Sequence, residues 1–154
     1  MKILLDVPKE GLCGLSKNFY EEISSLILSE IEILFSFPKK IGIGLSSASL
    51  EDMAMLNKEN IGKEGPTDIL SFPAYPDKET IKSLQGEEFF LGDIILCEDI
   101  IRKDAEKDDV SYEREMAFVF SHGILHLFGY EHSEEMFALQ DKVCENIKEE
   151  KITK

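Results

Sequence analysis

The chain has 154 residues, 43% of them hydrophobic, a size that buries roughly two-thirds of its unfolded surface and predicts one globular domain spanning residues 1–154. Its 31 acidic and 17 basic residues give a net charge of −14, which argues against nonspecific attraction to nucleic acid or anionic membranes. No apolar run reaches the ~18 residues that a membrane helix requires, and the first residues lack a signal-peptide pattern, so a cytoplasmic location is expected.

The first 45 residues predict a strand, a helix and a second strand. KILLDV and KKIGIGL are short apolar runs typical of buried strands. Between them, Ser16 is placed to cap a helix that continues to about Phe35. Pro38 closes that helix, because proline cannot continue the helical hydrogen-bond pattern.

The middle of the chain continues the mixture of helices and strands. SASLEDMAMLN predicts a helix capped by Ser49, and TDILSF predicts a strand that stops at Pro73. YPDKETIKSLQG is interpreted as a polar loop, EFFLGDIILC as a strand with a bulge at Gly92, and EDIIRKDAEKDD as a short charged helix.

The last third predicts two helices joined by a glycine turn. Residues 111–128 are apolar on more than one side, as in a helix packed centrally in a domain. Gly129 is placed to end this helix in a left-handed conformation. Ser133 then caps an amphipathic helix with Phe137 among its apolar residues. The alternation of strands and helices predicts an α/β or α+β fold.

All three histidines of the chain lie in the stretch SHGILHLFGYEH. His122 and His126 are four residues apart, so they lie one turn apart on the same face of the predicted helix. A left-handed turn at Gly129 would bring His132 back toward them. We therefore expect three imidazoles to converge from a helix and the turn that follows it.

Three nitrogen donors with a fourth position open are the arrangement of a catalytic zinc site. A lone histidine in an apolar helix is more often a hydrogen-bonded core residue, and a pair at this spacing is a weak signal for a metal. The third histidine follows a glycine at the expected spacing, and this favours a metal site. We therefore predict that His122, His126 and His132 bind one transition metal per chain.

The spacing of these histidines equals that of the metzincin proteases, HExxHxxGxxH, with one difference. The residue after the first histidine, which is the general-base glutamate in those proteases, is Gly123 here. A general base typically contributes 10²- to 10⁴-fold to rate. The sequence therefore predicts a metzincin-like metal-site helix without the peptidase chemistry.

Three stretches of the chain together resemble the YbeY-type endoribonucleases and rRNA maturation factors. The family signature reads roughly H-G-x-L-H-L-x-G-Y-D-H, and here it stands as HGILHLFGYEH. LNKENIGKEGPTDILSFP is similar to the family's LN…PTDVLSFP block, and FFLGDIILC to its LGDI strand. Order and spacing agree over about residues 40–145.

The resemblance implies a small mixed sheet of about four strands packed by about five helices. It implies zinc or a similar divalent metal on His122, His126 and His132. The implied activity is metal-dependent hydrolysis of single-stranded RNA in rRNA maturation and ribosome quality control. An acidic surface would also suit a basic partner, such as a ribosomal protein.

Two residues depart from the family pattern. Glu131 stands where the family usually has aspartate, so the acid is kept with one more methylene and is a candidate proton acceptor. Ile61 stands where the family usually has an arginine, which removes a candidate charge-assisted contact with phosphate. The alternative for Ile61 is an apolar residue packed in the core.

Four further residues are candidates for contacting the substrate. Lys58 and Lys63 could follow the RNA backbone, although scattered lysines are more often plain solvated surface. Asp68 and Ser71 could line the cleft, and the alternative is that they are ordinary polar residues of a strand.

Two other functions stay open at this point. The chain could be a metallohydrolase of another substrate, such as a peptide or a small ester, which a closed apolar cleft would favour. It could also be a noncatalytic, ribosome-associated metal-binding protein, which a filled fourth coordination position would favour.

Overall fold

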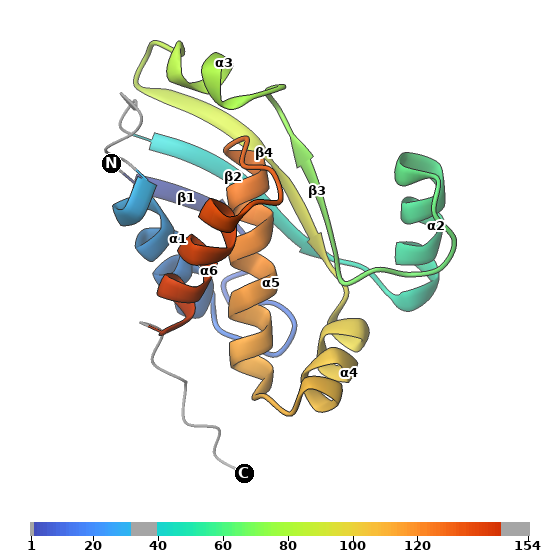
Figure 1. Ribbon diagram of the computed structural model, residues 1–154. Helices are drawn as coiled ribbons and strands as arrows, with labels where there is room; N and C mark the ends of the chain where they lie inside the picture. Colours follow the sequence, from blue (N-terminus) through green and yellow to red (C-terminus); the bar gives the residue numbers. More distant parts are fainter. Residues whose placement is uncertain (1, 32–39, 146–154) are drawn as a thin grey trace.

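The structure, a computed structural model, describes residues 2–31 and 40–145 (Figure 1). The end of the first predicted helix, at Phe35 and Pro38, lies outside these residues. The strands are β1 (Lys2–Asp6), β2 (Lys40–Ser47), β3 (Ile69–Pro73) and β4 (Glu88–Leu96). The helices are α1 (Lys17–Ile31), α2 (Leu50–Ile61), α3 (Lys78–Lys82), α4 (Glu98–Asp108), α5 (Tyr112–Leu127) and α6 (Glu134–Glu145).

The four strands form one mixed sheet in the order β1-β2-β4-β3, which confirms the expected fold class. β1, β2 and β4 are parallel, and β3 pairs antiparallel with β4 at the sheet edge. The predicted bulge is present in β4, because Phe90 pairs with Gly42 and Gly92 with the next residue, Ile43. Leu91 is thus the extra residue in the ladder.

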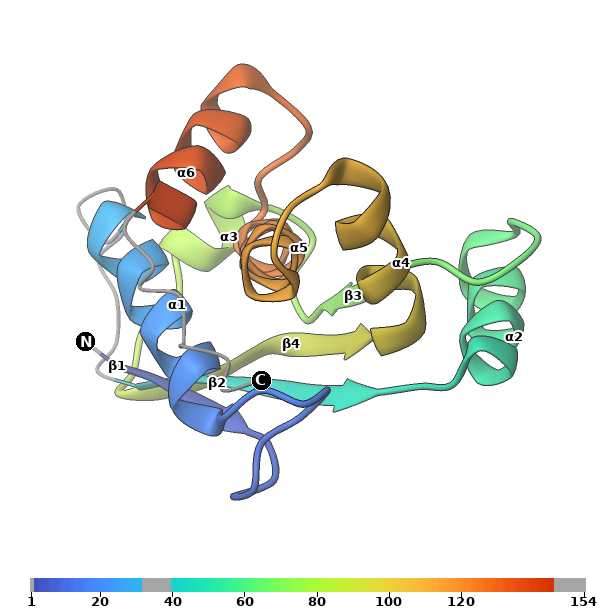
Figure 2. The same ribbon diagram turned by 90° about the horizontal axis from the view of Figure 1, so that it is seen from below.

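Most helices cover a single face of the sheet (Figure 2). The residues of β2 that alternate toward this face are Ile41, Ile43 and Leu45, and all three are buried. α5 lies centrally and packs against β3, β4, α1, α4 and α6. This position explains why α5 is apolar on several sides, as its sequence predicted.

α2 lies apart from the other helices, past the end of β2 (Figure 2). It is capped as predicted by Ser49, whose hydroxyl accepts a hydrogen bond from the backbone N–H of Asp52. Its buried Met53 packs with Leu70 of β3 and with Cys97, in a cluster separate from the main core. No helix among the described residues is long and apolar enough to cross a membrane.

One expectation about secondary structure is wrong. The segment interpreted as a polar loop contains α3, which is capped by the Asp77 carboxylate and buries Ile81. A five-residue helix with one buried residue has too little periodicity to be recognised from the sequence. Phe137, one of the apolar residues of α6, is 44% exposed.

Candidate metal centre

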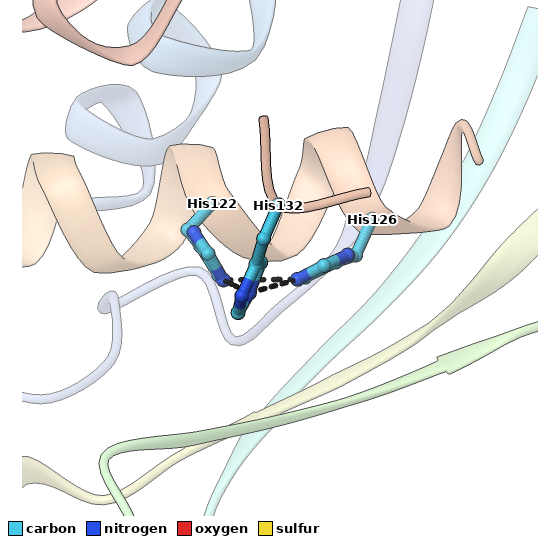
Figure 3. A group of neighbouring side chains, drawn as sticks. All are labelled: His122, His126 and His132. Carbon is cyan, nitrogen blue, oxygen red and sulfur yellow. Dashed lines mark hydrogen bonds between the residues drawn. The ribbon is translucent and has the colours of Figure 1, made fainter. Parts of the chain in front are cut away.

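The three histidines converge at one point beside α5 (Figure 3). The helix presents His122 and His126 one turn apart, as their spacing predicted. Gly129 follows the helix with a φ of 89°, in the left-handed region, and the turn returns His132 to the other two rings. The predicted convergence of the three side chains is therefore present.

The Nε2 atoms of the three imidazoles form a nearly equilateral triangle. The separations are 2.9 Å between His122 and His126, 3.1 Å between His122 and His132, and 3.1 Å between His126 and His132. Ligands of a tetrahedral zinc ion with Zn–N bonds of 2.0–2.1 Å lie about 3.3 Å apart. The triangle therefore has nearly the dimensions of one face of such a site.

The outer nitrogens of two rings fix which nitrogen carries the proton. His126 Nδ1 lies 2.9 Å from the carbonyl oxygen of Tyr130, which can only accept, so Nδ1 donates. His122 Nδ1 lies 3.4 Å from Gln140 Oε1, which also accepts. The neutral rings thus point two unprotonated Nε2 atoms at each other, an arrangement that a shared cation stabilises.

The electrostatic environment favours the neutral form of these rings. Burial, together with the neighbouring His126, lowers the pKa of His122 to about 4. Burial also lowers the pKa of His126. Because a metal ligand must offer an unprotonated nitrogen, both rings are ready to bind a metal at neutral pH.

Gln140 is a part of the site that the sequence did not indicate. It is completely buried on α6, and its Nε2 donates a hydrogen bond of 3.1 Å to the carbonyl oxygen of Phe118. This bond orients the amide so that Oε1 faces His122. A glutamine outside the motif gives no signal in one sequence, because only the packing of α6 on α5 brings it to the histidine.

We expect the substitution Gln140→Leu to weaken zinc binding about tenfold, because ligand-orienting partners typically contribute 10- to 100-fold and this contact is long. A competition titration with a chromophoric chelator measures the affinity. Gln85→Leu, at an exposed position in the loop after α3, is the matched control. Equal zinc affinity in the wild type and both variants would show that Gln140 does not orient His122.

An open cleft of about 380 Å³ lies beside the histidines. His122 and His126 line it together with residues from the end of α2, the following loop, β3 and α5. Among the predicted substrate contacts, the cleft brings together Lys63, Asp68 and Ser71.

Two candidates lie outside the lining of this cleft. Lys58 instead pairs with Glu64 at 3.7 Å in an exposed ion pair. Glu131 is exposed in the turn immediately before His132.

Ile61 lies on the wall of the cleft and is 53% exposed. The alternative that it packs in the core is therefore wrong. The departure from the family pattern changes the surface of the cleft, where an arginine side chain would reach solvent.

Gly123, at the position of the protease glutamate, faces the sheet rather than the cleft. A Cβ atom added to it would lie 2.6 Å from Cδ1 of Ile69 and 3.2 Å from Cδ1 of Ile94. A glutamate there would have to displace the ends of these two side chains, so a residue without a side chain suits the close approach of α5 to the sheet. At this position the chain has no carboxylate that could act as the protease's general base, and the position faces the sheet rather than the cleft.

Comparisons with known proteins identify the family. The family described as Endoribonuclease YbeY matches residues 10–148. The Endoribonuclease YbeY of Bacillus subtilis strain 168 is 34% identical over 94% of this chain and 96% of its own length, and that of Staphylococcus carnosus is 31% identical over 81% and 89%. A solution structure from Thermotoga maritima has a TM-score of 0.56 and 26% identity, covering 93% of this chain and 87% of its own. The chain belongs to the Endoribonuclease YbeY family.

Proposed function

We propose that this protein is a metal-dependent endoribonuclease that cuts single-stranded RNA in rRNA maturation and ribosome quality control. The observation that carries the proposal is the triangle of Nε2 atoms, two of them unprotonated, beside an open cleft. Membership of an endoribonuclease family supports RNA as the substrate. Partnership with ribosomal proteins and a cytoplasmic location stay predictions.

His122, His126 and His132 would hold one zinc ion, or another divalent transition metal, through their Nε2 atoms. Such an ion supplies Lewis acidity toward a phosphodiester oxygen and eases deprotonation of water. The Tyr130 carbonyl and Gln140 keep the rings of His126 and His122 turned toward the centre. Glu131, exposed beside His132, is the proposed proton acceptor.

The cleft would guide the RNA strand toward the histidines. Lys63 supplies a positive charge on the cleft wall, and Asp68 and Ser71 supply polar groups that can contact ribose hydroxyls or bases. The sequence has no lysine or arginine between Arg114 and Lys142, so the segment that carries the histidines has no such charge of its own. The bound metal and Lys63 are therefore the proposed phosphate contacts.

The other two functions are less well supported. Peptide hydrolysis on the metzincin pattern lacks its glutamate, because Gly123 stands at that position and faces the sheet. A purely structural metal would need no cleft beside its ligands, whereas His122 and His126 line one. Both observations favour a catalytic site that acts on an extended substrate.

The test combines metal analysis and an RNA cleavage assay on one chelator-treated and metal-restored sample. We expect about one metal per chain, loss of cleavage of single-stranded RNA with chelator, recovery with zinc, and no cleavage of peptides. Cleavage of RNA that resists the chelator would contradict the metal site. Efficient cleavage of peptides would instead favour the metallopeptidase function.

We expect Ile61→Arg to tighten binding of single-stranded RNA by roughly ten- to a hundredfold, the range of one charge-assisted contact. The salt dependence of binding should steepen by about one phosphate contact. Thermal stability should change little, because Ile61 is 53% exposed. Filter binding at several salt concentrations and thermal unfolding measure both effects.

Met55→Arg is the matched control for this substitution. Met55 lies on the same helix and is 54% exposed, but it does not line the cleft. Both variants gain one positive charge, so an equal gain in RNA affinity would indicate a general charge effect. A gain confined to Ile61→Arg would place the RNA in the cleft.

A further inference from the structure

Two exposed phenylalanines contact the region of the histidines from different helices. Phe118 is 37% exposed and lines the cleft beside His122 and His126. Phe137 is 44% exposed on α6, and its ring centroid lies 6.2 Å from that of His132. One aromatic ring therefore lies in the cleft, and the other lies outside its lining, against the third histidine.

The position of Phe118 follows from the helical repeat of α5. Phe118, His122 and His126 are spaced by four residues, so they form one stripe along the helix that faces the cleft. The apolar ring thus begins the row whose other members are two of the histidines. An RNA strand that reached these histidines along the cleft would pass over the ring.

We propose that Phe118 and Phe137 are stacking platforms for the nucleobases next to the phosphodiester that is cut. This inference rests on the proposed function. A phosphodiester held at the histidines has one nucleoside on each side, and base–aromatic stacking is common in the recognition of single strands. Two exposed rings near the same metal centre can receive the bases of these two nucleosides.

Stacking of this kind also explains how an acidic protein can bind RNA. The chain has a net charge of −14 and no lysine or arginine in the sequence between Arg114 and Lys142. Stacking contributes affinity without neutralising phosphates, so it adds little to the salt dependence. It also requires unstacked bases, which selects single strands over duplexes, and it tolerates different sequences.

The test uses the metal-loaded wild type and the variants Phe118→Ala and Phe137→Ala. The probe is a single-stranded oligoribonucleotide with one known cut, with or without an abasic nucleotide on one side of the cut. Each alanine variant should weaken binding about five- to a hundredfold, with an unchanged salt slope. Phe90→Ala is the control, because Phe90 is 49% exposed and packs over Gly42 of the sheet.

The abasic probes separate stacking from other effects. An abasic nucleotide on the side that Phe118 contacts should weaken binding to the wild type and have little further effect in Phe118→Ala. An abasic nucleotide on the other side of the cut should weaken binding to the wild type and have little further effect in Phe137→Ala. Phe118→Trp should keep or increase affinity, whereas Phe118→Leu, which keeps apolar bulk without a ring, should not.

Several outcomes would overturn the proposal. If an alanine substitution weakened binding of the intact and the abasic probes equally, stacking would be excluded. Full RNA affinity in Phe118→Leu would also exclude it. A dimeric wild type that Phe118→Ala or Phe137→Ala converts to monomers would assign the rings to an interface between copies. If an alanine variant fails to fold, loss of affinity in Phe118→Trp at normal metal content would contradict the platform. A metal-loaded wild type that cuts no RNA would refute the proposed function itself.

Discussion

Replacement of His126 by alanine is expected to leave the protein without bound metal and to abolish cleavage of RNA. His126 is one corner of the triangle, because its Nε2 is 2.9 Å from that of His122 and 3.1 Å from that of His132. Two remaining imidazoles are a weak site, so zinc affinity should fall by more than about 100-fold. Metal analysis after dialysis and a cleavage assay on the same sample measure both effects.

Gln140→Leu is expected to have a smaller effect on zinc affinity than His126→Ala. It keeps all three nitrogen donors and removes the contact that orients His122, so its effect on zinc affinity should lie between those of the wild type and His126→Ala. Full metal occupancy in His126→Ala would show that the three histidines do not form the site. Retained RNA cleavage without metal would separate the catalytic activity from them.

Gly129→Ala is expected to destabilise the fold and to disturb the metal site together. An alanine at a φ of 89° has a strained backbone, which costs about 1–3 kcal/mol. Its Cβ would also lie 2.6 Å from the backbone nitrogen of Lys78, so the turn or the start of α3 must move. His132 follows three residues later, so movement of the turn would displace it. Zinc affinity and the free energy of unfolding should therefore both decrease.

Gly62→Ala separates the two contributions to this loss. Gly62 has a φ of 79° at the end of α2, and a Cβ there would have no atom within 4 Å. It should show the backbone strain alone, with normal zinc affinity. Urea unfolding and zinc titration of both variants give the comparison. Equal losses of stability, with unchanged zinc affinity in both, would show that the contact with Lys78 does not hold the turn in place.

The features that the sequence predicted well are set by residues close together in the chain. The Ser49 cap and the turn at Gly129 depend on hydrogen bonds or backbone angles within a few residues. The convergence of the histidines follows from the helical repeat and that turn. Local rules were therefore sufficient to place all three imidazoles.

The features that were missed depend on packing between distant segments. Gln140 reaches His122 only because α6 packs against α5. The exposure of Phe137 depends on which face of α6 meets α5, and an amphipathic pattern locates that face only to within a residue or two. Lys63 lines the cleft while Lys58 does not, a difference that follows from the path of the chain after α2.

The short sequence separation of the three histidines also bears on how the metal affects folding. All three lie within 11 residues, so bringing them together in an unfolded chain closes only short loops, at a small entropic cost. The denatured chain can therefore retain part of its affinity for zinc. Because a ligand stabilises a fold only by its preference for the native state, zinc should raise the melting temperature less than its native affinity suggests. That preference arises from groups outside the motif, such as Gln140, which face the histidines only in the folded protein.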